Sequence, residues 1–215
     1  MNSDLPRTIT ASEITTYHRD GVVLLPSMFD EDWIQLLKNG LSTNCANPSS
    51  RSRVWDRDSA DRTMFYDSQA WQGISEYRQF IFDSPAAHIA AQLTGSAAIN
   101  FYFDAVFVRS PGSQFATPWH QDEPYWSVEG YNTCTLWMPL VPVKRENALA
   151  YVPGSHRLDS VFYQYNFGNL NPDGKTGALA FLRVYFHRTA NLLDLTVDDI
   201  HADTASGEGR DGLGC

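Results

Sequence analysis

Apolar side chains recur with a helical period through residues 8–95 of the chain. After Asp30, Trp33 and Leu37 are followed by a third apolar residue at the same four-residue spacing, which predicts a helix with one apolar face. Four helices are predicted in this part, several of them bounded by capping residues or by glycine. They run from the capping box Thr10–Glu13 to Gly21, from Asp30 through Leu41, over residues 69–82, and from Ser84 to Gly95.

The apolar period changes to two after Gly95. Apolar residues at every second position from Ile99 to Phe107 alternate with polar ones, which predicts a long strand with one buried face. Shorter strands, a loop and a turn are predicted from apolar runs, prolines and glycines. These are strands at residues 22–25, 117–123, 133–141, 147–152 and 181–186, a loop at 43–63 and a turn at 153–157.

Helices followed by strands predict an α+β fold, with the strands forming a barrel or double sheet over the helices. The chain has 215 residues, of which 43% are hydrophobic, enough for one domain with a core. We expect a single domain over residues 1–190, helical at 8–95 and strand-rich at 97–190. Residues 191–215 are acidic and Gly-rich with almost no strand pattern, so a tail is expected there.

Charge and composition exclude several classes of protein. The formal net charge is −9 and the sequence has no cluster of Lys and Arg, so a nucleic-acid-binding surface is not expected. No run of eighteen apolar residues could span a membrane, and the N-terminal residues do not have the pattern of a signal peptide. The three cysteines are widely separated and form no disulfide framework. A cytoplasmic location is therefore expected.

One short stretch carries the chemistry. His120 and Asp122 are two residues apart, and on an extended strand their side chains leave the same face and can converge on one ion. An imidazole and a carboxylate are two members of the 2-His-1-carboxylate triad that holds non-haem Fe(II). Pro118 and Pro124 bracket the pair, so this strand should be short or lie at a sheet edge. The pair is walled in by the aromatic residues Trp119, Tyr125 and Trp126.

Four fragments, in their order and spacing, resemble the phytanoyl-CoA dioxygenase family of Fe(II)/2-oxoglutarate oxygenases. They are Phe107-Val-Arg-Ser-Pro-Gly112, Thr117-Pro-Trp-His-Gln-Asp122, Leu136-Trp-Met-Pro-Leu140 and Tyr151-Val-Pro-Gly-Ser-His-Arg157. The resemblance covers residues 8–165. It implies a double-stranded β-helix, the cupin-like jelly-roll, with N-terminal helices packed on one sheet. It also implies Fe(II) and the co-substrates 2-oxoglutarate and O₂.

The resemblance also implies roles for individual residues. His120 and Asp122 match the family's metal ligands and are the expected catalytic residues, while Gln121 and Trp137 match positions that line the 2-oxoglutarate pocket. Arg109 is placed where relatives often carry a basic residue, and strand alternation directs it to the same interior as Phe107; a rim arginine at the strand end is the alternative. His156 lies in the Pro-Gly-Ser-His-Arg turn and is expected to be structural.

The family's distal part of the site is not recognisable in this sequence. Relatives carry a later metal-binding His and then an Arg that binds the far carboxylate of 2-oxoglutarate, as a forked guanidinium does well. Only His187 and His201 follow the turn at residues 153–157, and Arg210 comes nine residues after His201. The third metal ligand is therefore unassigned, with these two histidines as weak candidates. The jelly-roll is expected to lack its last strands, because the chain ends or departs from the family before them.

Three functions remain open at this point. The first is a non-haem Fe(II)/2-oxoglutarate-dependent dioxygenase that hydroxylates a small organic metabolite. The second is a truncated or degenerate family member that keeps the fold and at most binds metal or ligand weakly. The third is a cupin-like sugar-binding module that uses the aromatic side chains without metal. The sequence does not identify the substrate or the oligomeric state.

Overall fold

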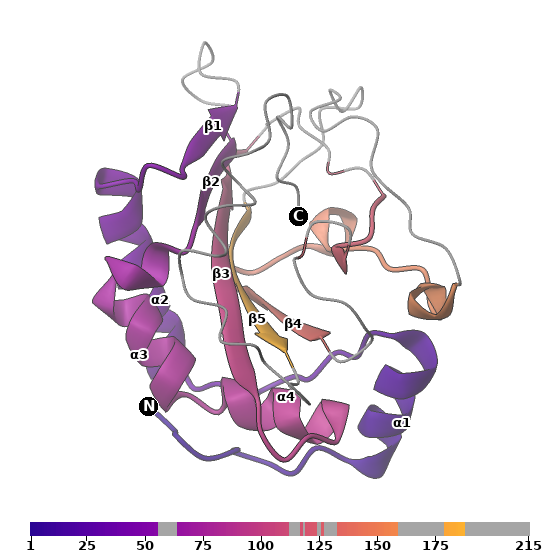
Figure 1. The fold of residues 1–215 in the computed structure, drawn as a ribbon. Coiled ribbons are helices and arrows are strands. Elements are labelled where there is room, and N and C mark those ends of the chain that lie inside the picture. The colour runs from indigo at the N-terminus through magenta and orange to yellow at the C-terminus, as the bar shows by residue number, and fades with distance from the viewer. Residues whose placement is uncertain are drawn as a thin grey trace.

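The computed structural model describes residues 1–55, 64–111, 117, 119–123, 126 and 133–158, and the backbone of residues 179–187. Within these residues, helices pack on a five-stranded antiparallel sheet (Figure 1). The helices are α1 (Ala11–Asp20), α2 (Glu31–Ala46), α3 (Ser75–Asp83) and α4 (Ala86–Thr94), with 3-10 turns at Ala70–Gln72, Arg145–Asn147 and Ser155–Arg157. The strands are β1 (Arg53–Trp55), β2 (Met64–Ser68), β3 (Asn100–Arg109), β4 (Thr133–Pro139) and β5 (Leu179–His187). The expected tail at 191–215 lies outside the described residues.

The strand order in the sheet is β1-β2-β3-β5-β4, and every neighbouring pair is antiparallel. β5 therefore lies between β3 and β4, although it comes last in the chain. The predicted strand at residues 181–186 is confirmed in its backbone and is slightly longer, from Leu179 to His187. A strand from late in the chain thus joins two earlier strands, which no local pattern indicates.

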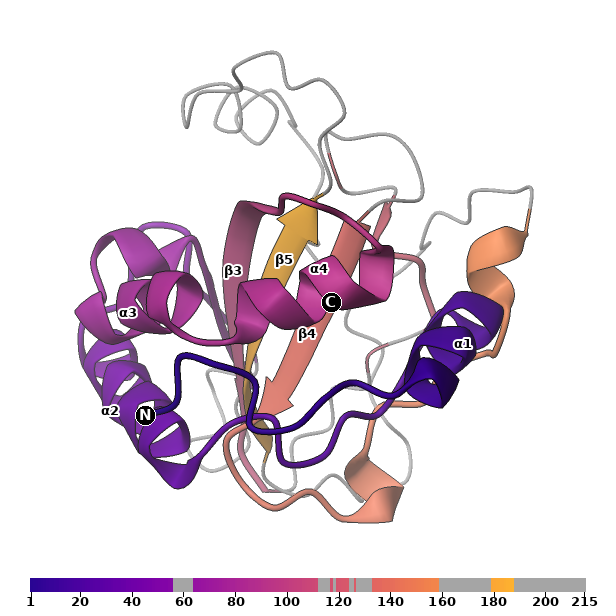
Figure 2. The same ribbon diagram turned by 90° about the horizontal axis from the view of Figure 1, so that it is seen from below.

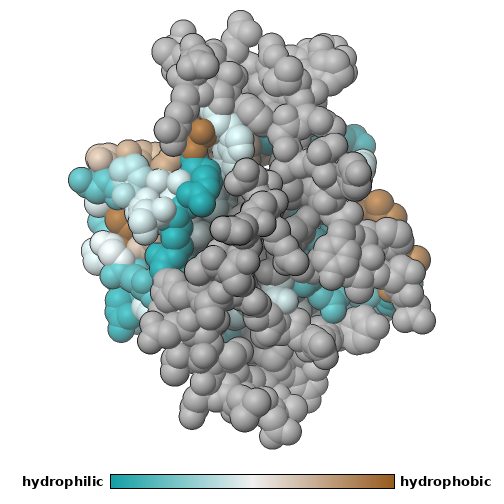
Figure 3. Space-filling view, turned by 45° about the horizontal axis from the view of Figure 1, so that its top comes forward, coloured by the Kyte–Doolittle hydropathy of each residue, from teal (hydrophilic) through white to brown (hydrophobic). Residues whose placement is uncertain are grey.

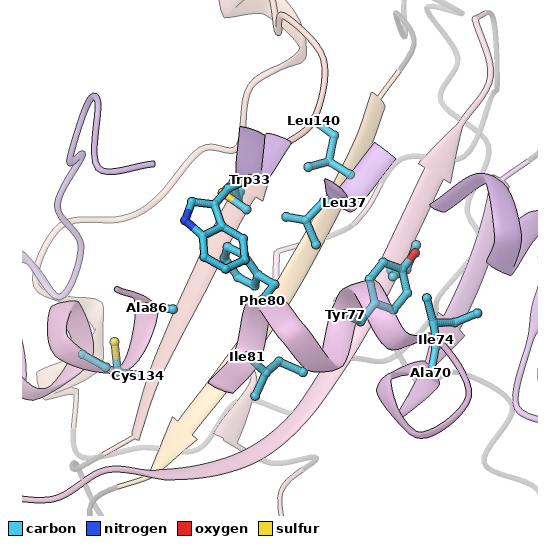
Figure 4. Close-up of a cluster of buried hydrophobic side chains, with 13 residues drawn as sticks. Trp33, Leu37, Ala70, Ile74, Tyr77, Phe80, Ile81, Ala86, Cys134 and Leu140 are labelled. Carbon is cyan, nitrogen blue, oxygen red and sulfur yellow. The ribbon is translucent and has the colours of Figure 1, made fainter. Parts of the chain in front are cut away.

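Helices α2, α3 and α4 cover one face of this sheet (Figure 2). Trp33 and Leu37 of α2 lie on the buried side of the helix, as the four-residue spacing predicts, and they meet Phe80 of α3 (Figure 4). The rings of Trp33 and Phe80 are edge-to-face, with centroids 5.6 Å apart. Buried residues of β3 and β4, among them Val106 and Met138, complete this main core.

Most predicted helix ends are confirmed, but Ser84 is not the N-cap of α4, which begins at Ala86 after Pro85. The Thr10 hydroxyl accepts a hydrogen bond from the backbone N–H of Glu13, and the Glu13 carboxylate accepts one from the backbone N–H of Thr10. Asp30 accepts a hydrogen bond from the N–H of Trp33 at the start of α2. Gly21 and Gly95 end α1 and α4 with positive φ, at 77° and 62°, a conformation that glycine adopts without steric cost.

The opposite face of the sheet holds a second cluster, called here the aromatic face. Its buried members are Tyr66, Ala105 and Phe107, and the partly buried residues packed against them are Trp55, Met64, Tyr102, Phe103, Trp126 and Trp137. The expectation that β3 has one buried face is therefore wrong. A bulge between Phe101 and Phe103 places these two residues in different clusters, so the alternation changes phase there. Asp104, expected on a polar face, is fully buried towards the helices.

Several local predictions were also wrong. The helix predicted over residues 69–82 is a 3-10 turn at Ala70–Gln72 followed, after Gly73, by α3 (Ser75–Asp83). Residues 22–25 form no strand and Leu24 is 85% exposed, because this segment pairs with no other strand. The strand predicted at residues 147–152 is absent: Asn147 ends a 3-10 turn and residues 148–152 have no ladder pairing. Helix α2 continues to Ala46, so the loop predicted at residues 43–63 begins too early, and it contains the short strand β1. A further strand, β2, was not predicted.

The described part of the surface in Figure 3 is mainly hydrophilic, with isolated apolar patches. None of the helices in the described ranges has the length and hydropathy needed to cross a membrane.

Candidate metal centre

His120 and Asp122 converge. The Nε2 atom of His120 lies 3.2 Å from the Oδ1 atom of Asp122, and the two side chains are 12% and 19% exposed. The segment that carries them is not a strand, because residues 119–123 show no ladder pairing. Proline lacks a backbone N–H, so Pro118 and Pro124 remove a ladder donor on each side of the pair. The predicted meeting of the two groups is thus observed, while the extended strand expected to produce it is not.

Two contacts attach this segment to the aromatic face of the sheet. The Arg109 guanidinium, through Nη2, donates a hydrogen bond to the Thr117 hydroxyl at 3.3 Å, three residues before His120. On the other side, the Trp126 ring packs against the aromatic face, and its backbone N–H donates to the Glu123 carbonyl at 3.0 Å. The segment is therefore attached to this face on both sides of the pair, at Thr117 and at Trp126.

The donor set fits a first-row divalent metal ion. A nitrogen and an oxygen bound at neighbouring coordination positions, each about 2.1 Å from an ion, lie about 3 Å apart. The observed separation of 3.2 Å between His120 and Asp122 is close to this value. An imidazole and a carboxylate are also the ligand types that non-haem iron takes from proteins. Within the described ranges, no group of three His, Cys, Asp or Glu side chains completes such a site.

The residues expected to line a 2-oxoglutarate pocket lie on or near the same face. Trp137 of β4 packs in the aromatic face, and Arg109 lies at the C-terminal end of β3 beside Thr117. Strand alternation places Arg109 on the same side of β3 as Ala105, and its hydrogen bond to Thr117 agrees with this placement. Gln121 lies between the two candidate ligands in the chain and is partly buried.

The candidates for the third ligand are placed less favourably. In the register of β5 with β3, His187 lies opposite Asn100. Asn100 is nine residues from Arg109 along β3, a distance of about 30 Å. Thr117, bound to Arg109, is within about 10 Å of His120 along the chain. This distance counts against His187 as a ligand of an ion held by His120. His201 lies outside the described residues.

His156 contacts the end of helix α1. The backbone N–H of Gly154 donates to the Asp20 carbonyl at 2.8 Å, and the His156 ring lies directly against Gly21. Figure 2 shows the turn that carries His156 beside α1. The ring fills space that only a glycine at position 21 leaves open, which agrees with the structural role expected for His156.

Sequence reasoning missed Thr117 and the inner rings of the aromatic face. Nothing in the sequence marks Thr117 as the partner of Arg109, because the two meet only when the chain returns to the sheet. Trp55 lies in a strand inside the predicted loop, and Tyr66 lies in a strand that was not predicted. Their aromatic composition was the available signal, since aromatic residues favour strands.

Comparison with known proteins gives one family. The family profile described as Phytanoyl-CoA dioxygenase (PhyH) matches residues 17–174. No curated protein matches the chain.

Solved structures share the fold at low sequence identity. The non-heme alpha ketoglutarate dependent carbocyclase SnoK from nogalamycin biosynthesis is 20% identical over 88% of this chain and 81% of its own, with a TM-score of 0.65. AviO1 from Streptomyces viridochromogenes Tue57 is 20% identical over 86% of this chain and 99% of its own, with a TM-score of 0.64. EctD from S. alaskensis, crystallised with 2-oxoglutarate and 5-hydroxyectoine, is 17% identical over 89% of this chain and 79% of its own, with a TM-score of 0.57.

Proposed function

The chain belongs to the phytanoyl-CoA dioxygenase family, and from this premise we propose that it is a non-haem Fe(II)/2-oxoglutarate-dependent dioxygenase that hydroxylates a small organic metabolite. The observation that carries the proposal is the 3.2 Å approach of His120 Nε2 to Asp122 Oδ1. The similar solved structures include proteins whose names state use of alpha ketoglutarate and one crystallised with Fe3+ and alpha ketoglutarate. These support the same cofactors for this chain, within a jelly-roll fold.

Each residue of the site has a defined part in the proposal. His120 and Asp122 would hold Fe(II) with one nitrogen and one oxygen. Arg109, held at Thr117, would present its guanidinium to a carboxylate of 2-oxoglutarate, and Gln121 and Trp137 would line that pocket. When bound, iron and 2-oxoglutarate supply the activation of O₂ that converts a substrate C–H bond to an alcohol, with succinate and CO₂ as the other products.

The substrate is proposed to be small and not a coenzyme A ester. A coenzyme A ester carries several phosphate charges, which need a cluster of basic side chains. The sequence has 16 Lys and Arg against 25 Asp and Glu, and the four arginines of residues 51–62, its densest basic stretch, are interspersed with three aspartates. The proposal therefore follows the charge of this chain and takes no substrate from the family's name.

A second candidate is an inactive family member that retains the fold. It is favoured by one observation: the residues that the structure describes contain no third metal-binding side chain near His120 and Asp122. Two ligands hold a metal ion more weakly than three, so this candidate predicts weak metal binding and no turnover.

Metal binding separates the two candidates. We expect anaerobic titration with Fe(II) in the presence of 2-oxoglutarate to produce the weak visible charge-transfer band of the chelated metal. His120→Ala and Asp122→Ala should each abolish the band at the same metal concentration, because each removes one of two close donors. Absorption spectroscopy under nitrogen measures the band.

The matched control is His88→Ala, which removes an exposed histidine on α4. This variant should keep the full band. A folded wild-type protein that shows no band at saturating Fe(II) would support the inactive family member instead. A band that persists in His120→Ala would remove His120 from the site.

A further inference from the structure

The aromatic face has an aromatic composition that binding a metal ion alone does not require. Seven of its nine members are aromatic, and the other two are Ala105 and Met64. The rings form a connected row across three strands: the centroids of Tyr66 and Phe107 are 4.9 Å apart, and those of Trp55 and Tyr66 are 6.3 Å apart. The inner rings are buried, while the tryptophans around them remain partly exposed.

Partial exposure of large rings distinguishes this face from the main core. In the main core the side chains of Trp33, Tyr77 and Phe80 are at most 2% exposed. On the aromatic face, Trp55, Trp126 and Trp137 come from three distant parts of the sequence and all remain accessible to solvent in part. Accessible tryptophan rings offer a flat apolar surface, which attracts another flat ring by burial and by stacking.

The aromatic face continues directly into the candidate metal centre. Trp126 packs on it and is connected by a backbone hydrogen bond to Glu123, the residue after Asp122. Arg109, at the C-terminal end of β3, is hydrogen-bonded to Thr117, three residues before His120. A molecule lying on these rings would therefore be next to the two candidate ligands.

We propose that the aromatic face is the substrate-binding wall, and that it selects a substrate with a planar ring. This deepens the proposed function, because it names the substrate class of the same site. The ring of the substrate stacks on Trp126 and the neighbouring rings, which places its edge towards His120 and Asp122.

Binding of two matched probes to the metal-free full chain tests the proposal. The probes are 2-naphthol, which is planar and uncharged at neutral pH, and decahydro-2-naphthol, which has the same carbon skeleton and hydroxyl but is not planar. We expect 2-naphthol to bind at least about tenfold more tightly in equilibrium dialysis, since only the planar ring can stack. Trp126→Leu should weaken 2-naphthol binding about tenfold and leave the saturated probe nearly unchanged.

Two further variants keep the test decisive. Trp126→Phe retains a flat ring and should recover most of the discrimination even if Trp126→Leu disturbs the fold. Trp71→Leu removes a tryptophan that packs with the main core, and it should leave 2-naphthol binding unchanged. Equal binding of the two probes, or a preference for 2-naphthol that survives Trp126→Leu, would overturn the proposal.

The outcome is independent of the iron test. Dialysis is carried out without metal, so failure to form the charge-transfer band does not affect it. If the band forms but the two probes bind equally, the dioxygenase proposal is supported and the proposal that the aromatic face binds the substrate is wrong.

Discussion

At the scale of single residues, Asp104 couples folding to pH. Its carboxylate is completely buried where β3 faces the helices, and this burial raises its pKa to about 7. The backbone N–H groups of Trp71 and Ala70 oppose the shift, and the charge of Asp67 adds to it. The protein therefore keeps a proton on Asp104 under conditions in which an exposed aspartate has lost it.

The sign of the resulting pH dependence follows from proton binding. The ordinary pKa of aspartate is 3.8, so between that value and about 7 the folded chain binds a proton that the unfolded chain has released. The contribution of Asp104 to the free energy of unfolding is therefore complete below pH 3.8, and it falls as the pH rises from 3.8 to about 7. Asp104→Asn imitates the protonated acid. Between about pH 5 and pH 8 the free energy of unfolding of the wild type should fall, and that of the variant should fall by about 1–3 kcal/mol less.

Urea unfolding at both pH values measures this effect. Asp83→Asn, which changes an exposed carboxylate at the end of α3, should keep the wild-type pH dependence. If Asp104→Asn and the wild type lose the same free energy over this range, Asp104 does not carry the proton.

Gly21 is a second residue whose role depends on a distant contact. Its φ of 77° disfavours any residue with a side chain, and a Cβ atom at this position would collide with the His156 ring. The glycine thus serves both the end of α1 and the docking of the turn at residues 153–157. Only the first of these roles is visible in the local sequence.

Gly95 provides a matched control for Gly21. It also ends a helix with positive φ, at 62°, but nothing lies within 4 Å of a Cβ built there. Gly95→Ala should lower the free energy of unfolding by about 1 kcal/mol through backbone strain alone. Gly21→Ala should cost about 1 kcal/mol more, because the methyl group also displaces His156.

Chemical denaturation of the two variants checks the difference. His156→Ala removes the collision, so adding it to Gly21→Ala should recover part of the extra loss. Equal destabilisation by Gly21→Ala and Gly95→Ala would show that the His156 contact contributes nothing.

At the scale of elements, one buried carboxylate connects α2 to the sheet. Asp67 of β2 is fully buried and accepts hydrogen bonds from the Asn44 amide at 2.8 Å, from the backbone N–H and hydroxyl of Ser49 at 2.8 and 2.5 Å, and from the N–H of Ser68 at 2.9 Å. The carboxylate therefore fixes the end of α2 and the chain that follows it against β2. The carboxylate can be buried here because four donors replace the hydrogen bonds it would make to water.

Removing this carboxylate should loosen both elements. Asp67→Ala leaves the Asn44 amide and the Ser49 N–H without their acceptor, and we expect a loss of about 3 kcal/mol in unfolding free energy. Amide hydrogen exchange should increase at the end of α2. Asn39→Ala, an exposed change on the same helix, should have little effect on either measurement. A small loss for Asp67→Ala would mean that water replaces the acceptor.

At the scale of the whole molecule, the two faces of the sheet have different roles. One face is closed by α2, α3 and α4 and supplies stability through fully buried side chains. The other carries the aromatic face and the segment with His120 and Asp122. A rigid, helix-backed sheet can hold two donor atoms at a fixed separation, and precise metal and substrate sites need this rigidity.

The helical part of the chain was predicted well because its signals are local. Capping residues, a four-residue apolar period and terminal glycines act within a few residues, and α1, α2 and α4 follow them closely. Strands were predicted less well. β1 and β2 were taken for part of a loop or left unassigned, and residues 22–25 have the composition of a strand but no partner.

Local sequence signals are enough to predict α1, α2 and α4, the strand β3 and the pairing of an imidazole with a carboxylate at positions 120 and 122. They are enough because capping, periodicity and ligand spacing are properties of neighbouring residues. Three features come from tertiary contacts: β5 lies between β3 and β4, the bulge buries Asp104, and Arg109 and Trp126 attach the segment with His120 and Asp122 to the aromatic face. These features depend on contacts between residues far apart in the chain, which are set by the packing of the whole fold.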